Sequence, residues 1–289
     1  MEKILFGFPE NGKLTRRLAE LTGSILGKME IHHFPDGETY VRVDSDISGE
    51  KVVMVCTLDR PDEKLLPLYF LSKTARDLGA HSICLVAPYL AYMRQDKRFK
   101  TGEGITSEYF ASLISGLADS LVTIDPHLHR RISLSEIYSI HTRVSHASAH
   151  ISRWIKENVE RPFIIGPDRE SEQWVSEVAN NAGAKYIILD KVRHGDMDVE
   201  ISTPDITKYN DYIPVLVDDI ISTGKTMIET IYHLKKTGMK PPVCIGVHAI
   251  FSDNSYENLL AAGAKKVITC NTIEHVSNSI DISDLLTNF

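Results

Sequence analysis

The stretch that decides the fold is VLVDDIISTGKTM, residues 215–227. It opens with apolar residues that predict a buried strand over 214–217, and two carboxylates, Asp218 and Asp219, are expected to end that strand. A short loop rich in Ser, Thr and Gly follows. Apolar residues then recur at helical spacing over 227–234, which predicts a helix that begins there.

This loop has the chemistry of a phosphate site. Its backbone N–H groups and hydroxyls would face an anion at a helix N-terminus, where the helix dipole favours negative charge. Asp218 and Asp219 would lie one short step away, because ligands of open α/β sheets bind beyond the carboxyl ends of the strands. Carboxylates there accept hydrogen bonds from vicinal hydroxyls, directly or through Mg²⁺. The stretch therefore suits ribose 5-phosphate, with a phosphate cradle formed by Ser222, Thr223, Gly224, Lys225 and Thr226.

Two other interpretations of the stretch are weaker. A P-loop requires the spacing Gly-x-x-x-x-Gly-Lys-Ser/Thr, which the stretch does not have. A turn with no ligand is the second alternative, but two adjacent carboxylates at the end of a buried strand are costly without a partner. A ligand site is therefore favoured.

The composition limits the class of protein. The chain of 289 residues suits two medium domains, and a hydrophobic content of 43% supports ordinary cores. A net charge of −7 argues against nucleic acid as the main partner, and no apolar run approaches the length of a membrane span. The N-terminus lacks a signal-peptide layout. The four cysteines lack metal-ligand spacing, which predicts reduced core residues of a cytoplasmic protein.

The two halves of the chain have the same plan. In the first half we predict strands at 4–7, 29–33, 40–43, 52–57, 82–87 and 121–124, and helices at 13–26, 65–78 and 107–117. In the second half we predict further strands at 163–166, 186–189, 243–247 and 267–270, and further helices at 172–182 and 256–262. Similar runs at 75–85 and 234–245 indicate an internal duplication. We therefore predict two α/β domains, 1–145 and 146–289, each with a mostly parallel sheet flanked by helices.

Other polar groups follow expected strands in the second half. Asp168 follows the strand at 163–166, and it suits either a Mg²⁺ ligand or a helix N-cap. Lys191 and Arg193 are two residues apart on an extended segment, so their side chains point the same way. They suit charge stabilisation in phosphoryl transfer, or alternatively a solvated hairpin.

Three stretches of the first half also carry candidate groups. Asp125 and His127 end a strand, and His127 would favour a phosphate or capping role, because Mg²⁺ prefers oxygen ligands. Arg94 and Gln95 could bind an adenine edge and a phosphate; alternatively, they belong to a solvated charged loop. Phe34 opens an Asp-Gly turn, where an exposed aromatic ring favours a stacking partner.

Five motifs, in this order, resemble those of the ribose-phosphate diphosphokinases, also called PRPP synthases. They are the Phe-x-Asp-Gly-Glu loop at 34–38, the Pro-Tyr run that ends in Arg-Gln-Asp at 88–96, Asp-x-His at 125–127, Lys-x-Arg at 191–193, and the stretch at 215–227. The last motif is shared with type I phosphoribosyltransferases. The resemblance covers nearly the whole chain and implies two tandem domains like those transferases, with residues 280–289 packed on the first domain.

The resemblance also implies a reaction and its residues. ATP and ribose 5-phosphate would give PRPP and AMP with Mg²⁺ as cofactor. It assigns catalysis to Lys191 and Arg193 and the sugar phosphate to Asp218, Asp219 and the cradle named above. It assigns ATP binding to Phe34, Asp36, Glu38, Arg94, Gln95, Asp96 and His127. It assigns metal binding to Asp125, His127 and Asp168.

A homo-oligomer is implied as well, since the loop at 34–38 reaches ATP on a neighbouring subunit in the family. After Asp168 the family has a glycine-richer turn, whereas Arg169, Glu170 and Ser171 resemble the shorter, archaeal-type members. A PRPP-consuming phosphoribosyltransferase would explain the stretch at 215–227 alone. A non-catalytic paralogue that regulates a true synthase is the alternative outside the enzymes, and retention of Lys191, Arg193 and His127 argues against it.

Overall fold

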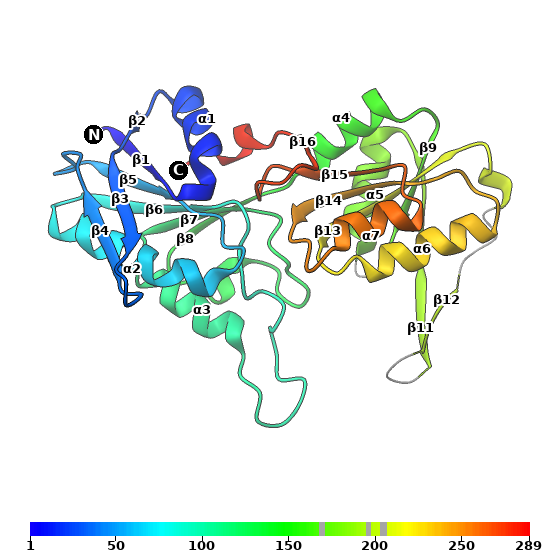
Figure 1. Cartoon of the computed structure of the whole chain (residues 1–289), viewed down its shortest axis with the longest axis horizontal. Helices are drawn as coiled ribbons and strands as arrows, with labels where there is room; N and C mark the ends of the chain where they lie inside the picture. Colours follow the sequence, from blue (N-terminus) through cyan, green and yellow to red (C-terminus); the bar gives the residue numbers. More distant parts are fainter. Residues whose placement is uncertain (168–170, 195–197, 203–206) are drawn as a thin grey trace. The chain divides into compact units, whose positions relative to one another are not determined.

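The computed structural model describes residues 1–167, 171–194, 198–202 and 207–289, which form two compact units (Figure 1). Unit 1 comprises Met1–His146 with Ser283–Phe289, and unit 2 comprises Ala147–Ile282. Each unit contains one six-stranded sheet in which all described pairings are parallel. Helices flank both sheets, so the predicted α/β class is confirmed.

The sheet of unit 1 has the strand order β2-β1-β5-β6-β7-β8. Its strands are β1 (Lys3–Gly7), β2 (Ile25–Leu26), β5 (Lys51–Val55), β6 (Ser82–Ala87), β7 (Ser120–Ile124) and β8 (His141–Ser145). Its helices are α1 (Gly12–Thr22), α2 (Pro61–Asp77) and α3 (Thr106–Ser115), with short 3-10 turns η1 (Pro9–Asn11), η2 (Leu134–Glu136) and η5 (Ser283–Leu286). An antiparallel hairpin, β3 (Met29–His33) and β4 (Thr39–Val43), forms a sheet of its own.

The sheet of unit 2 has the order β10-β9-β13-β14-β15-β16. Its strands are β9 (Pro162–Gly166), β10 (Lys185–Ile188), β13 (Ile213–Ile221), β14 (Val243–Ala249), β15 (Lys266–Cys270) and β16 (Asn278–Ile280). Its helices are α4 (Ser148–Asn158), α5 (Glu172–Ala182), α6 (Lys225–Lys236) and α7 (Ser255–Ala262), with the 3-10 turn η4 (Thr207–Tyr209). A second antiparallel hairpin consists of β11 (Asp190–His194) and β12 (Asp198–Ser202).

The two units repeat one topology. From β1 and from β9 onward, each chain segment forms strand, helix, strand, hairpin, strand, helix, strand, helix and two strands, and the sheet orders correspond position by position. Because β1 to β2 and β5 to β6 step in opposite directions along the sheet, right-handed crossovers place α1 on one face and α2 and α3 on the other. This match of order and topology supports the predicted duplication.

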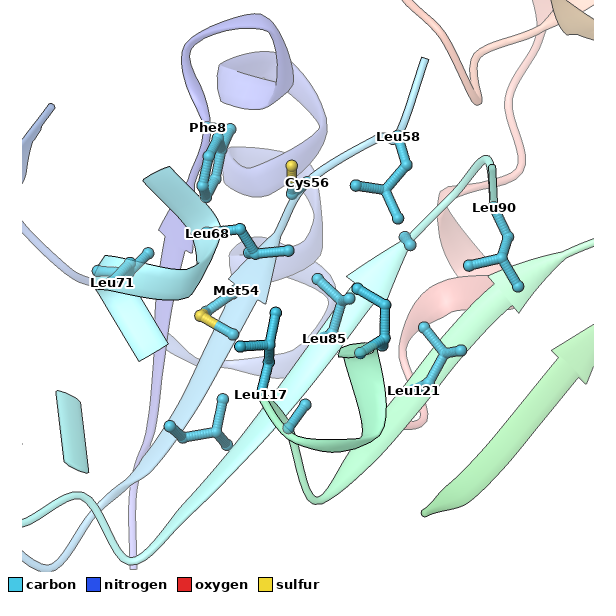
Figure 2. Close-up of a cluster of buried hydrophobic side chains, with 14 of the residues drawn as sticks. Phe8, Met54, Cys56, Leu58, Leu68, Leu71, Leu85, Leu90, Leu117 and Leu121 are labelled. Atoms are coloured by element: carbon cyan, nitrogen blue, oxygen red, sulfur yellow. The ribbon is translucent and has the colours of Figure 1, made fainter. Parts of the chain in front are cut away.

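The core of unit 1 shows why these segments become strands and helices. Alternate residues of the central strands, such as Met54 and Leu85, point to the face covered by α2 and α3. Leu68 and Leu71 of α2 and Leu117 after α3 pack against them (Figure 2). Each such side chain contributes roughly 1.5–3 kcal/mol when it leaves water, so this face holds the helices to the sheet.

One predicted helix is wrong in extent. The helix predicted at 13–26 ends at Thr22, because Gly23 adopts a left-handed conformation with φ of 65° and caps α1. Ile25 and Leu26 then form the edge strand β2. Strands β8 and β16 and helix α4 were not predicted. The strands are short and their residues are only partly buried, so their sequences lack the apolar run typical of a central strand.

Two expectations from composition can be compared with the structure. All four cysteines are buried, and burial raises the pKa of the Cys56, Cys84 and Cys244 thiols. These thiols are therefore protonated and unreactive at neutral pH. Within the described ranges, none of the helices has both the length and the apolar character needed to span a membrane.

Gly246 of β14 lies against Ile221, the last residue of β13, and has no room for a side chain. A Cβ at Gly246 would lie 2.6 Å from Cγ1 of Ile221. We expect Gly246→Ala to lower the free energy of unfolding by about 1–3 kcal/mol through overpacking, measured by urea unfolding followed by circular dichroism.

The matched control is Gly12→Ala at the start of α1. A Cβ at Gly12 would lie 3.8 Å from its nearest neighbouring atom, Nη1 of Arg16, and the φ of −58° suits any residue. We expect no loss of stability from this change. Equal unfolding midpoints for the two variants would contradict the steric argument.

Candidate functional site

Strand β13 carries the acidic pair within it, not at its end. Its pairing with β9 ends at Leu216 opposite Ile165, whereas its pairing with β14 continues to Ile221 opposite Ala249. The prediction that Asp218 and Asp219 end the strand is therefore wrong. The cause is the length of β14, which provides backbone partners beyond the apolar run, and the local pattern of β13 does not reveal it.

The two carboxylates lie where β13 has passed the end of β9. Successive side chains of a strand point to opposite faces of the sheet, so those of Asp218 and Asp219 lie on different faces. Both residues are half-buried, and Asp218 lies opposite Gly246 in the register. Oδ1 of Asp218 accepts the backbone N–H of Asp219 at 3.0 Å, which fixes the first carboxylate locally.

The predicted cradle connects β13 to α6. Helix α6 begins at Lys225, earlier than predicted, and Gly224 is its N-cap with φ of 66°. A Cβ at Gly224 would lie 3.3 Å from Cγ of Leu259 in α7, so both the conformation and the close approach favour glycine. Since glycine has no side chain to cap the helix, the N–H groups of the first turn face the loop. Such a terminus is suited to an anion.

A small hollow, partly open to solvent, lies beside the cradle. It is lined by Ile165, Gly166, Pro167, Leu189, Leu216, Val217, Thr226, Met227 and Thr230. The lining thus joins the carboxyl end of β9 to β13 and to the first turns of α6. The hydroxyl of Thr230 donates to the carbonyl of Thr226 at 2.8 Å, which ties the last cradle residue to its helix.

The predicted catalytic cations lie on the hairpin of unit 2. Lys191 and Arg193 belong to β11, in register with Ile201 and Val199 of β12. The extended backbone predicted for this segment is observed, and it follows the buried Leu189 directly. The predicted metal ligand Asp168 and the following Arg169 and Glu170 lie outside the described residues.

Asp125 in unit 1 follows β7 directly and has an unusual environment. It is only 7% exposed and its φ is +36°, a left-handed conformation that non-glycine residues rarely adopt. Its Oδ1 lies 2.7 Å from Nδ1 of His146, so the buried carboxylate has a charge-assisted partner. The ring of His127 lies against that of His129 in a tilted arrangement, with 3.9 Å between centroids.

The predicted metal site can be compared with these groups. Among the residues that the structure describes, no three His, Cys, Asp or Glu side chains gather as metal ligands. Mg²⁺ in phosphoryl-transfer sites usually takes one or two carboxylates and completes its shell with substrate phosphates and water. A buried carboxylate such as Asp125 fits this requirement, and Asp168 lies outside the described residues.

The structure connects two of the predicted ATP segments. Asp96, whose side chain is 5% exposed, accepts two contacts from Nη1 of Arg130, at 2.8 and 3.1 Å. Oε1 of Gln95 accepts the hydroxyl of Thr106 at 3.0 Å, so this side chain also anchors the start of α3. Arg94 is exposed. Arg130 thus holds the loop at 94–98 to the loop after β7, a role that sequence reasoning missed, because the pair is 34 residues apart.

The Phe34–Glu38 loop forms the turn of the β3–β4 hairpin. The N–H of Phe34 donates to the carbonyl of Glu38 at 2.8 Å, and Oδ1 of Asp36 accepts the N–H of Glu38 at 3.2 Å. The Phe34 ring makes edge contacts with His32 and Tyr40, at centroid distances of 5.6 and 5.9 Å, yet the residue is 45% exposed. The predicted stacking surface is therefore available on the hairpin tip.

The corresponding loop of unit 1 carries a cation instead of an anion cradle. Cys56 and Thr57 follow β5, where β13 has its carboxylates. Lys64, in the first turn of α2, folds back into the loop, and its side chain is 6% exposed. Its Nζ lies 2.5 Å from Oδ1 of Asp59, 3.0 Å from the carbonyl of Thr57 and 3.5 Å from Oε2 of Glu10. The Lys64 ammonium thus contacts protein oxygens, and the loop at 56–61 lacks the Ser-Thr-Gly run of unit 2.

Comparisons with known proteins agree with this architecture. Residues 3–117 match the N-terminal domain of ribose phosphate pyrophosphokinase, and residues 133–284 match the phosphoribosyl transferase domain. The ribose-phosphate pyrophosphokinase of Sulfolobus acidocaldarius is 33% identical over 287 residues, covering 98% of this chain and 97% of that protein. The Saccharolobus solfataricus ribose-phosphate pyrophosphokinase is 34% identical over 275 residues, covering 93% and 92%.

A solved structure shows the same fold. The phosphoribosylpyrophosphate synthetase from Mycobacterium smegmatis superposes with a TM-score of 0.86 at 22% identity, over 100% of this chain and 97% of that one. The fold is thus the two-domain phosphoribosyltransferase type. The chain belongs to the ribose-phosphate pyrophosphokinase family, which confirms the resemblance inferred from its motifs.

Removal of the Lys64 ammonium would test its role in unit 1. We expect Lys64→Ala to destabilise the protein by about 2–3 kcal/mol, because Asp59 and the carbonyl of Thr57 lose a buried partner. Thermal unfolding measures the effect. The control is Lys73→Ala, an exposed lysine on the same helix, which we expect to change stability by less than about 0.5 kcal/mol. Similar losses from both variants would contradict a special role for Lys64.

Proposed function

We propose that the protein transfers the β,γ-diphosphoryl group of ATP to the anomeric hydroxyl of ribose 5-phosphate, giving PRPP and AMP. The observation that carries the proposal is family membership over nearly the whole chain, at 33% identity over 287 residues to a ribose-phosphate pyrophosphokinase. The glycine-capped start of α6, which suits a phosphate, adds independent support. Its counterpart in unit 1 lacks both the acidic pair and the Ser-Thr-Gly run, so we propose one sugar-phosphate site per chain.

In unit 2, the proposed sugar-phosphate site follows from the chemistry of β13 and its loop. The N–H groups and hydroxyls between Ser222 and Thr226 would bind the 5-phosphate. Asp218 and Asp219 would accept hydrogen bonds from the ribose hydroxyls, since ionised carboxylates are acceptors only. Lys191 and Arg193 would stabilise the negative charge of the transferred group.

In unit 1, we propose that ATP is bound by the three segments identified from their motifs. Arg94 and Gln95 would contact the nucleotide, with Asp96 held by Arg130 as a support for this loop. His127 would bond a phosphate. The exposed Phe34 ring, with Asp36 and Glu38, would reach the ATP of a neighbouring subunit, which requires a homo-oligomer.

We propose Mg²⁺ as the cofactor, bound through the ATP phosphates. The candidate ligands are Asp125 and His127 in unit 1 and Asp168 in unit 2. When bound, it would neutralise phosphate charge and hold the diphosphoryl group in a reactive orientation. The 2.7 Å contact between Nδ1 of His146 and Oδ1 of Asp125 orients this buried carboxylate.

The proposed reaction is an in-line displacement at the β-phosphorus. The anomeric oxygen forms the new bond to that phosphorus, and the bond from the phosphorus to the bridging oxygen of the α-phosphate breaks, so that AMP leaves. The hydroxyl proton passes to water. Such transition states are loose in most accounts, so positioning and charge stabilisation by the chain are the main requirements.

Incubation of the purified protein with Mg²⁺, ATP and ribose 5-phosphate, followed by nucleotide analysis, tests the proposal. AMP that forms only when the sugar phosphate is present would support it. ADP in place of AMP would indicate transfer of the γ-phosphoryl group alone. ATP binding with no nucleotide product would favour the regulatory paralogue, and a phosphoribosyltransferase would consume PRPP instead.

The hairpin assignment predicts a large loss of turnover. We expect Lys191→Ala to lower kcat by ~10³-fold or more, by analogy with cationic groups that stabilise phosphoryl transfer. The control is Lys208→Ala, an exposed lysine in η4, which we expect to leave kcat unchanged. Near-normal turnover of the Lys191 variant, with circular dichroism like that of the wild type, would reject the assignment.

A further inference from the structure

The segment that follows β14 is bonded to the start of the phosphate cradle. The N–H of Phe251 donates to the carbonyl of Ile221 at 2.9 Å, and the N–H of Ser252 donates to the carbonyl of Ser222 at 3.1 Å. The hydroxyl of the buried Ser255 donates to the same Ser222 carbonyl at 2.7 Å. The hydroxyls of Ser222 and Ser252 lie 2.9 Å apart. We name residues 251–255 the bracket.

The bracket is held in an uncommon conformation. Phe251 has φ of 39° and Asp253 has φ of 56°, and neither is glycine. Non-glycine residues in this region cost of order 1–3 kcal/mol each and persist only where the surroundings fix them. The Phe251 ring packs against His275 and Tyr256, at centroid distances of 4.5 and 5.5 Å. Strain of this kind is concentrated at functional sites. Here the strained backbone conformation places Ser252 against the cradle.

The His275 ring supports the bracket in its neutral form. Burial lowers the pKa of His275, which the nearby Glu257 only partly offsets. Nδ1 of His275 accepts the N–H of Ser277 at 3.2 Å, which requires that this nitrogen carry no proton. The His275 ring beside Phe251 is therefore uncharged at neutral pH.

We propose that Ser252 is a positioning residue for the 5-phosphate, an inference that rests on the proposed function. A free serine hydroxyl samples three staggered rotamers, and a bond to Ser252 selects one for Ser222. A phosphate oxygen only accepts hydrogen bonds. When Ser252 donates to Oγ of Ser222, the Ser222 proton is directed to the phosphate, and the two bonds polarise each other.

The inference extends the site beyond the stretch at 215–227. Ser252 lies 30 residues after Ser222 in the chain, so a segment distant in sequence also contacts the cradle. Ser255 supports the same point through the backbone of Ser222, and its substitution would loosen the loop as a whole. Within the bracket, Ser252 is the residue that contacts the hydroxyl of Ser222, so the effect of its side chain on the phosphate can be measured separately from folding.

The test compares Ser252→Ala with Ser176→Ala, a serine of α5 whose hydroxyl bonds only Gln173 of its own helix segment. We expect Ser252→Ala to raise the KM for ribose 5-phosphate about threefold to tenfold, the effect of one lost hydrogen bond. The KM for ATP and the Tm should equal those of the control. Ser252→Thr, which keeps the hydroxyl, should restore the wild-type KM.

An unchanged KM for ribose 5-phosphate in Ser252→Ala would overturn the inference. So would equal rises in both KM values together with a lower Tm, because they would indicate a structural role alone. Calorimetric binding of ribose 5-phosphate without ATP separates this inference from the reaction. A wild type that forms no AMP, but binds the sugar phosphate more tightly than Ser252→Ala, would reject the reaction and keep the positioning role. A wild type that binds no ribose 5-phosphate would overturn both.

Discussion

The parallel pairing of β13 with β14 is the constraint on which the candidate site depends. Because these strands stay paired to Ile221 and Ala249, the acidic pair is held on rigid backbone past the end of β9. The same pairing fixes the position of Ser222, the residue after β13. Because Gly246 has no side chain, the side chain of Ile221 can lie directly against it. Gly224, in a left-handed conformation, then joins the loop to the first turn of α6.

The two units have one topology but different charged groups at the loop that follows the central strand. In unit 2, the helix after the central strand has Gly224 as its N-cap, and the N–H groups of its first turn suit an anion. In unit 1, the helix at the same place begins with Pro61, and the ammonium of Lys64 is buried among Asp59, Glu10 and a carbonyl. The backbone plan is duplicated, whereas the side chains at this point differ: Asp218 and Asp219 in unit 2, Cys56 and Thr57 with the buried Lys64 in unit 1. A fold of this kind shows where a ligand can bind, and the side chains decide whether one does.

The sequence predicts what is local and misses what is paired at a distance. Buried parallel strands are continuous apolar runs, so the central strands and the α/β class could be recognised directly. The loop between β13 and α6 could be recognised too, because Ser222, Thr223 and Gly224 are consecutive. The true end of β13 could not, since it depends on the length of β14. The same holds for His146 with Asp125, Arg130 with Asp96 and Ser252 with Ser222, whose partners lie 21 to 34 residues apart.

The return of the last residues to unit 1 has a consequence for biosynthesis. Ser283–Phe289 belong to unit 1, where η5 packs against α1 and β7, Leu286 and Phe289 are buried, and Lys3 lies 5.0 Å from the Phe289 ring. Unit 2 is thus inserted between two parts of unit 1. A ribosome that makes the chain from its N-terminus must release unit 2 before unit 1 receives its final segment. The first unit to emerge is therefore the last to be completed, and it must keep an apolar surface open while its neighbour folds.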